Sequence, residues 1–573
     1  MARRRGRGGR WRTAPLAMLL TLATALLAGC AAPTLPWQAH SPAPLPDAQQ
    51  ILRLSLPGYN PPAVNLDPDQ FYPGDLTLQF LMPLLYSTLF TLDAQQRPVP
   101  LLATGYDVSA DGLRSTIHLR ADARFTDGTP LTSSDVAFSL NRAIADCASD
   151  APFAFSTLKD EPRLMETLCL GSATPNQPPT SSLIGDALLT PDPQTLVIVL
   201  SQPDGALAAK LAEPYCGIVE RAIVMQYGNT WAQHLADGGG QGTSGMYRLA
   251  NTSAYNAGRG LRMTLERVSH SWGAVPRLRQ VILDLYPRDS LATGDVIFDG
   301  GDGFSQQRVS GMAWHTAPTR ADALLTLDPQ EPGLSDIRVR QALALTVDKI
   351  ALAKSMGAVA TNHLTPPGIA GYPTALSGPI ASAPLTGDVA QAQALLRSYV
   401  ADKCGGSARA CPRIFVWDVG WTGGMSQMFP LFDRWKAALP GLPVIGTDPP
   451  DLLPVSCCPY YSARPLTWYE DYPDPQDWLS YFAQVPAFQP IAHDATADAL
   501  VMSAEDTHDP TARLALYHEA EETVINDAVV VPIAQLQMTW GVSPTVVNFP
   551  ANPAPYIAPS AWARIYLTAP ASG

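Results

Sequence analysis

The chain has 573 residues, of which 46% are hydrophobic and only 16% charged, so it is a core-forming globular chain long enough for two or three domains. Its net charge of −13, with no Lys/Arg run beyond the first residues, argues against nucleic acid as a partner. The 55 prolines predict long, stiff loops and argue against a coiled coil or a mainly helical bundle.

The N-terminus has the pattern of an export signal. Arginines precede an apolar run from Ala14 to Leu27, which is short for a transmembrane helix and typical of the core of a signal peptide over residues 1–29. The run ends in Leu-Ala-Gly-Cys30, similar to a bacterial lipobox, in which the thiol carries a diacylglycerol. An ordinary signal peptide with a chance cysteine is the alternative. We expect residues 30–50, rich in Ala, Pro and Gln, to form a lipid-anchored flexible tether.

Seven further cysteines fit an exported protein. The segment CGGSARAC could close a small disulfide loop between Cys404 and Cys411, and Cys147 with Cys169 could close a larger one. An odd number leaves at least one thiol without a partner in the chain. No C-x-x-C pair with matching histidines occurs, which argues against a zinc site. We expect no metal site and no cofactor.

Short strand patterns alternate with amphipathic helical patterns, which favours a mixed α/β fold. The predicted strands are 115–120, 195–200, 261–268 and 279–287, and the predicted helices are 133–145, 335–357 and 509–527. We expect a Ser cap and apolar Val136, Phe138, Leu140 and Ile144 on the helix over 133–145. For the long helix over 335–357, we expect Ser335 as its cap and Gly357 at its end.

The stretch TWYEDYPDPQDWLSYF, residues 467–482, combines aromatic rings and carboxylates around two prolines. Asp474 followed by Pro475 is typical of a helix start, with Asp477 in the first turn. Since Pro473 favours an extended conformation in the residue before it, we expect Asp471 at a strand end or in a loop just ahead of that helix. Binding residues commonly lie in such places.

The stretch resembles the DYPDP segment of the extracytoplasmic solute-binding proteins, family 5, of ABC transporters, which bind oligopeptides, dipeptides or nickel. Other segments of the chain resemble this family in the family's order. They are NLDPDQ (65–70), the region 84–143, GTSGMYRL (242–249), LERVSHSWG (265–273), IRVRQALALTVDKIALAK (337–354) and NHLTPPGIAGY (362–372). Departures include Val268, where the family usually has Asn. The resemblance covers roughly residues 50–545.

The resemblance implies an α/β, type II periplasmic-binding-protein fold: two lobes, an extra domain that makes three, and a hinged cleft. On this sequence, domain I is expected at 50–85, 186–286 and 535–570, domain II at 86–185, and domain III at 287–534. The resemblance also implies a function, the capture of short peptides for delivery to the permease subunits of an ABC transporter. The protein would be a monomer, held outside the cytoplasmic membrane by a lipid on Cys30.

The resemblance assigns three ligand-binding candidates. In family members that bind peptides, the Asp that heads the motif receives the α-ammonium of the ligand, and that position is Asp471 here. Trp468 corresponds to a nearby pocket wall, and Tyr472 is a further candidate. The alternative for Asp471 is a surface acid paired with an arginine such as Arg464. A calcium site at Glu470 and Asp471 is disfavoured, because the prolines stiffen the loop.

The sequence lacks the motifs of several common enzyme classes. No G-x-S-x-G motif occurs, YHEAEE (517–522) lacks the second histidine of a zinc motif, and the glycine-rich DGGGQGTSG (237–245) lacks Gly-Lys-Ser/Thr. We therefore expect no enzyme. The same fold binding a sugar, a nickel complex or another solute, or acting as a tethered sensor, stays open. The tryptophans Trp417, Trp421 and Trp435 keep a sugar in consideration.

Overall fold

The computed structural model describes residues 43–58, 65–145, 154–159, 183–238, 240–255, 260–269, 272–287, 293–299, 308–417, 429–447, 463–483, 494–553 and 556–570. The predicted signal peptide, Cys30, Cys147, Cys169 and Trp421 lie outside these ranges.

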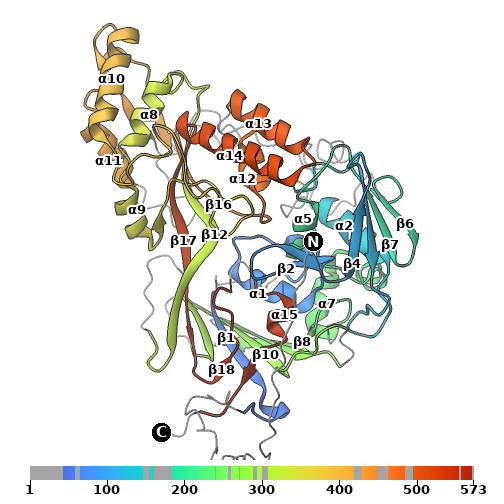
Figure 1. Ribbon diagram of the computed structural model, residues 1–573. Coiled ribbons are helices and arrows are strands. Elements are labelled where there is room, and N and C mark those ends of the chain that lie inside the picture. The colour runs from blue at the N-terminus through green and yellow to red at the C-terminus, as the bar shows by residue number, and fades with distance from the viewer. Residues whose placement is uncertain are drawn as a thin grey trace, which may run out of the picture. The chain divides into compact units, whose positions relative to one another are not determined.

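A mixed 11-stranded sheet runs through the described part of the chain (Figure 1). Its strand order is β15-β14-β16-β12-β17-β11-β1-β10-β9-β8, and β13 also pairs with β17. The strands are β1 (Ile51–Gly58), β8 (Tyr247–Tyr255), β9 (Gly260–Arg267), β10 (Gln280–Pro287), β11 (Val296–Asp299), β12 (Ala313–Leu327), β13 (Val359–Ala360), β14 (Ile414–Trp417), β15 (Val444–Thr447), β16 (Ala463–Tyr469) and β17 (Val530–Val542).

Two hydrophobic cores lie along this sheet. The first lobe is built on a core drawn mainly from residues 52–298 and 538–567. The second lobe is built on a core drawn from residues 323–534. Strands β12 and β17 contribute side chains to both cores, so they carry the sheet from one lobe into the other. Their mutual register shifts between Pro318 and Asp322, at the passage between the lobes.

A four-stranded sheet and the two-stranded sheets β2-β3 and β18-β19 belong to the first lobe. The four-stranded sheet has the order β4-β5-β7-β6, and α2 contacts it. The strands are β2 (Phe90–Leu92), β3 (Pro98–Pro100), β4 (Ala103–Val108), β5 (Arg114–Leu119), β6 (Leu188–Asp192), β7 (Thr195–Val199), β18 (Val546–Val547) and β19 (Tyr566–Leu567).

The helices are α1 (Leu76–Leu85), α2 (Ser133–Ala145), α5 (Leu207–Lys210), α6 (Arg221–Tyr227), α7 (Trp231–Gly238), α8 (Ile337–Leu345), α9 (Lys349–Met356), α10 (Val389–Lys403), α11 (Phe429–Ala438), α12 (Pro475–Ala483), α13 (Ala495–Glu505), α14 (Pro510–Asn526) and α15 (Pro559–Trp562). Short 3-10 turns add η1 (Asp47–Gln49), η2 (Pro68–Gln70), η4 (Pro214–Cys216), η5 (Gly228–Thr230) and η6 (Ala408–Ala410). None of these helices is long and apolar enough to span a bilayer.

The four predicted strands are confirmed as β5, β7, β9 and β10, and the helices predicted over 133–145 and 509–527 are confirmed as α2 and α14. On α2, Val136, Leu140 and Ile144 are buried, and Phe138 packs against the same core. The spacing of apolar residues, with period 2 in strands and 3.6 in helices, therefore predicted the secondary structure of these segments correctly.

The single helix predicted over 335–357 is wrong, because the chain forms α8 and α9 with a break between them. Asp348 caps α9 by accepting from the Ala351 amide at 3.0 Å, and the Asp388 amide donates to the Leu345 carbonyl at the end of α8. Asp336, not Ser335, is the cap of α8. Gly357 does end α9, in the left-handed region with φ 65°.

The beginning of the described chain is attached to the first lobe. The Leu45 amide donates to the Leu567 carbonyl at 2.8 Å. The Gln50 side chain both donates to the Leu567 carbonyl at 3.1 Å and accepts from its amide at 2.8 Å. The last residues of the predicted tether therefore pack beside β19.

Cysteine pairing is visible at one predicted position. Cys404 and Cys411 form a disulfide just after α10. Cys216 is a buried free thiol, and burial raises its pKa well above the ordinary value.

Candidate ligand-binding site

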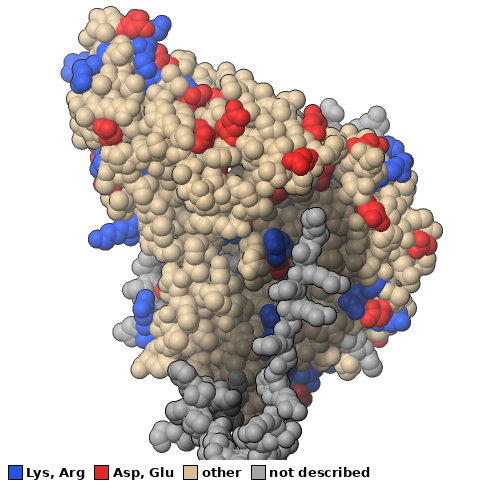
Figure 2. All heavy atoms as spheres, in the orientation of Figure 1, with Lys and Arg blue, Asp and Glu red and all other residues tan. Residues whose placement is uncertain are grey.

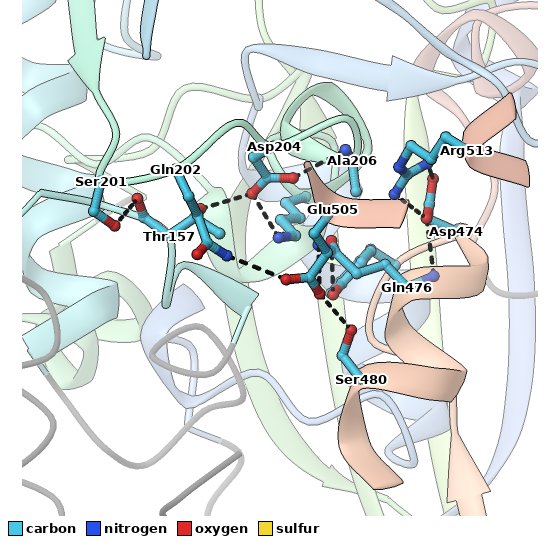
Figure 3. Close-up of polar contacts among 12 residues, drawn as sticks. Thr157, Ser201, Gln202, Asp204, Ala206, Asp474, Gln476, Ser480, Glu505 and Arg513 are labelled. Atoms are coloured by element: carbon cyan, nitrogen blue, oxygen red, sulfur yellow. Dashed lines mark hydrogen bonds and ion pairs between the residues drawn. The ribbon is translucent and has the colours of Figure 1, made fainter. Parts of the chain in front are cut away.

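The stretch 467–482 connects the sheet to α12 at the boundary of the two lobes. Asp474 accepts from the Gln476 amide at 2.9 Å and Pro475 begins α12, as predicted. Arg513 of α14 holds the other side of Asp474 through two hydrogen bonds, of 2.9 and 2.7 Å (Figure 3). This buried two-point pair fixes the start of α12.

Asp477 positions two of the predicted ligand-binding residues. One of its carboxylate oxygens, Oδ2, accepts from the Trp468 indole at 3.2 Å and from the Asp471 amide at 3.1 Å. Asp471 lies between β16 and α12, as predicted, and is 8% exposed. Trp468 is half-buried and packs against the second core. The sequence suggested only a helix-start role for Asp477, whereas this carboxylate fixes Asp471 and Trp468 relative to each other.

Tyr472 packs across the boundary between the lobes. It belongs to the first core, whereas Trp478 and Leu479, only a few residues later, belong to the second. Its hydroxyl donates to the Gln476 side chain at 3.4 Å, and the Lys210 ammonium lies 5.0 Å from its ring centroid. Burial raises the pKa of Tyr472 well above its ordinary value. The structure therefore makes Tyr472 a buried contact between the lobes.

A second aromatic contact joins the lobes beside this stretch. The rings of Tyr72, in the loop before α1, and Tyr469, at the end of β16, meet edge-on with centroids 5.9 Å apart. Tyr72 is 51% exposed. The contact therefore lies at the surface, two residues along the chain from Asp471.

Polar side chains of the two lobes also meet directly (Figure 3). Gln202, in the loop after β7, donates to Glu505 of α13 at 3.1 Å. The other Glu505 oxygen accepts from Ser480 at 2.9 Å and from Gln476 at 3.5 Å. Burial raises the pKa of Glu505. A Cβ on Gly205 would lie 2.8 Å from Nε of Arg513, so the lobes approach closely here.

Lys210 and Asp204 form a buried ion pair on the first-lobe side of this contact. Their charged atoms are 2.7 Å apart, and Asp204 also accepts from Thr157 and from the Ala206 amide. Burial raises the pKa of Asp204, but the Lys210 ammonium together with the hydrogen bonds from Lys210, Thr157 and the Ala206 amide outweighs burial, so the pKa is lowered. The ion pair fixes Lys210 beneath Tyr472.

Arg320 connects the lobes at the register shift of β12. Its guanidinium pairs closely with Glu470 of the second lobe and lies 3.4 Å from Glu213, which precedes η4 in the first lobe. Trp478 donates to the second Glu470 oxygen at 3.4 Å. Burial raises the pKa of Glu213 to about 8 despite the nearby arginine, with Glu470 adding to the rise.

Sequence reasoning missed Arg320, Glu213, Gln202, Glu505 and Arg513, because their partners lie far away along the chain. Trp435, one of the tryptophans that kept a sugar in consideration, is fully buried in the second core and donates to the Leu343 carbonyl. It is therefore not available as a stacking surface. Among the described residues, no group of three or more His, Cys, Asp or Glu side chains is arranged to hold a metal ion.

One cavity, of about 180 Å³, opens elsewhere, within the first lobe. Its wall includes Arg120 and Trp272, whose guanidinium and indole ring are stacked 4.8 Å apart. None of the predicted ligand-binding residues lines it.

Two cores joined by long strands, with polar and aromatic side chains meeting at their boundary, define a two-lobed binding protein of the type II periplasmic α/β class. The comparisons with known proteins agree. The family model described as "Bacterial extracellular solute-binding proteins, family 5 Middle" matches residues 97–407. The chain belongs to this family of extracellular solute-binding proteins, which is a family of binding proteins and not of enzymes.

The relatives bind several kinds of solute. A probable deoxycholate-binding periplasmic protein of Escherichia coli is 23% identical over 82% of this chain and 86% of its own length. The periplasmic oligopeptide-binding protein OppA of the same species is 24% identical over 49% of this chain and 51% of its own length. Among solved structures, the unliganded open form of the murein tripeptide-binding protein MppA has a TM-score of 0.68 and 21% identity, covering 92% of this chain and 99% of that one.

Proposed function

We propose that this protein captures short peptides between its lobes and delivers them to the permease subunits of an ABC transporter. Asp471 would hold the α-ammonium of the peptide and Trp468 would form a wall of the pocket, with Tyr472 packed behind them. A lipid on Cys30 would tether the protein outside the cytoplasmic membrane. The observation that supports this most directly is that Asp477 fixes Asp471 and Trp468 together where the two lobes meet.

The physical requirements of peptide capture match this position. An ammonium leaves water only if an ionised acceptor is fixed in place, and a charge-assisted hydrogen bond contributes roughly 1.5–3 kcal/mol. Asp471 is nearly buried, so little water competes with the ligand. Among similar structures, that of Haemophilus influenzae OppA is a complex with the peptide RPPGFSPFR, which makes peptides the first ligands to test.

Calorimetry with two ligands separates the role of the ammonium from the rest of the peptide. We expect the protein to bind tri-alanine about 10- to 100-fold more tightly than N-acetyl-tri-alanine, because acetylation removes the charge. Asp471→Asn should lower the affinity for tri-alanine to that of the acetylated peptide. Asp506→Asn, at an exposed acid after α13, should change neither value. Equal binding of the two peptides by the unaltered protein would exclude the proposed role of Asp471.

The probable deoxycholate-binding relative favours a second candidate, an amphiphilic anion, because its similarity extends over most of both chains. The same calorimetry therefore includes deoxycholate, a mixture of oligosaccharides, and Ni²⁺. Binding of deoxycholate without any tripeptide would replace the peptide proposal. Mass spectrometry of the membrane-bound protein tests the anchor: a diacylglycerol on an N-terminal Cys30 is expected, and an unmodified or differently cleaved N-terminus would contradict it.

A further inference from the structure

Asp322 is a buried acid at the boundary of the lobes whose charge no described residue balances. It lies on β12, directly opposite Trp468 of β16 on one side and Gln535 of β17 on the other. It is 1% exposed, and its Oδ1 has no hydrogen-bond partner among the described residues. A buried polar oxygen without a partner is costly and calls for an explanation.

The other buried acids around it have partners. Glu470 pairs with Arg320, Asp474 with Arg513, and Asp477 with the Trp468 indole. Glu521 of α14 accepts from the Leu364 and Thr365 amides and from the Thr365 hydroxyl. Asp322 differs from each of them in this respect.

The arginine closest to Asp322 along its own strand is already engaged. Arg320, two residues earlier on β12, lies between Glu470 and Glu213. Burial, together with the carboxylates of Glu470 and Glu521, raises the pKa of Asp322 well above its ordinary value. The surroundings of Asp322 are therefore negative, and a positive group arriving there would relieve both burial and repulsion.

Its position relative to Trp468 suggests what that group would be. Directly opposed residues of antiparallel strands project from the same face, with Cβ atoms about 5 Å apart. A carboxylate beside an indole ring suits an organic cation, since the carboxylate pairs with the charge and the ring face attracts it. Asp471 follows Trp468 by three residues, so the chain between these two residues spans at most about 10 Å.

We propose that Asp322 is a second cation-binding residue of the ligand site, which selects short peptides carrying Lys or Arg next to their N-terminal ammonium. The inference rests on the proposed function, because Asp471 is taken to hold the ammonium. The net charge of −13 would favour the approach of such peptides. Figure 2 shows acidic side chains gathered over α13 and α14 on one face, above a hollow in which the visible charged side chains are mainly Lys or Arg.

The test compares Ala-Lys-Ala with Ala-norleucine-Ala, which has a side chain of similar length without the ammonium. By calorimetry, we expect the unaltered protein to bind the lysine peptide at least tenfold more tightly. Asp322→Asn should abolish this preference and leave the affinity for the norleucine peptide within about threefold. Glu521→Gln, at a buried acid that has its partners, should retain the preference. Thermal unfolding of both variants checks that they are folded.

The outcomes separate this inference from the proposed function. If the unaltered protein binds both peptides equally, or if Asp322→Asn keeps the preference, Asp322 does not contact the ligand and its oxygen is satisfied by a proton alone. Peptide capture at Asp471 would survive that result. If neither peptide binds, the proposed function and this inference both fail. Even if Asp322→Asn does not fold, equal binding of the two peptides by the unaltered protein contradicts this inference.

Discussion

Two buried arginines contact the segment 470–474, and they face different amounts of negative charge. Arg513 meets one carboxylate, Asp474, through two parallel hydrogen bonds. Arg320 meets two, Glu470 and Glu213, and the larger share of its contact goes to Glu470. The first arrangement is balanced as it stands, whereas the second carries an excess negative charge that one proton would neutralise. Buried ion groups of similar appearance can therefore respond to pH in different ways.

The largest effect is expected from breaking the balanced pair. Arg513→Met should lower the free energy of unfolding by about 3–5 kcal/mol, because it leaves Asp474 buried without its cation and removes the support of the α12 start. Denaturant unfolding followed by tryptophan fluorescence measures it. In the double variant Arg513→Met with Asp474→Asn, most of the loss should be recovered. A loss below about 1 kcal/mol in the single variant would show that Asp474 finds water instead.

The group of Arg320, Glu470 and Glu213 should instead make the stability of the protein depend on pH. The folded-state pKa of Glu213 is about 8, above its ordinary value, so its contribution to stability is fully present below about pH 4.5 and is lost as the pH rises through 8. We expect the unaltered protein to lose about 1–3 kcal/mol of stability relative to Glu213→Gln between pH 5 and 8.5. Thermal unfolding of both proteins across this range measures the difference. Parallel stability curves would contradict the raised pKa.

The smallest loss of stability is expected from removing the hydrogen bond between Gln202 and Glu505, which links the lobes without an arginine. Gln202→Leu removes the donor to Glu505 at a position where Ser480 and Gln476 still donate. We expect a loss of about 1 kcal/mol or less in denaturant unfolding. The control, Gln194→Leu at an exposed position after β6, should lie within experimental error of the unaltered protein. A loss as large as that of Arg513→Met would mean that Glu505 depends on Gln202 alone.

Local patterns were enough to predict much of the fold. The cap at Asp474, the proline at the first turn of α12, and the strand and helix periods are properties of neighbouring residues. The break after Leu345 was missed because Thr346-Val347-Asp348 keeps the apolar spacing of a helix. The interruption is stabilised by two backbone hydrogen bonds to a distant segment: the Asp388 amide donates to the Leu345 carbonyl, and the Lys349 amide donates to the Leu385 carbonyl.

The site was predictable only through resemblance. The motif placed Asp471 and Trp468, and their role in binding stays a prediction. Nothing in the residues around Arg320 indicates that it contacts Glu470, 150 positions later, and Glu213, 107 positions earlier. Asp322 lies in an otherwise apolar strand pattern, Ala-Asp-Ala-Leu-Leu, and a polar residue in such a run was the one signal that could have marked it.

The register shift in β12 also bears on how the two lobes can move relative to each other. Around Thr319, side chains take over bonds that the backbone ladder would make: its hydroxyl donates to the Leu536 carbonyl, and Gln535 donates to the Thr319 carbonyl. Side-chain hydrogen bonds can exchange partners while the strands on either side stay intact, so we expect the two strands to twist more readily here than where their backbone ladder is regular. Asp322 is three residues from this pivot. A ligand bound to Asp322 would therefore act next to the point where the strands twist. Its binding would be coupled directly to a change in the angle between the two lobes.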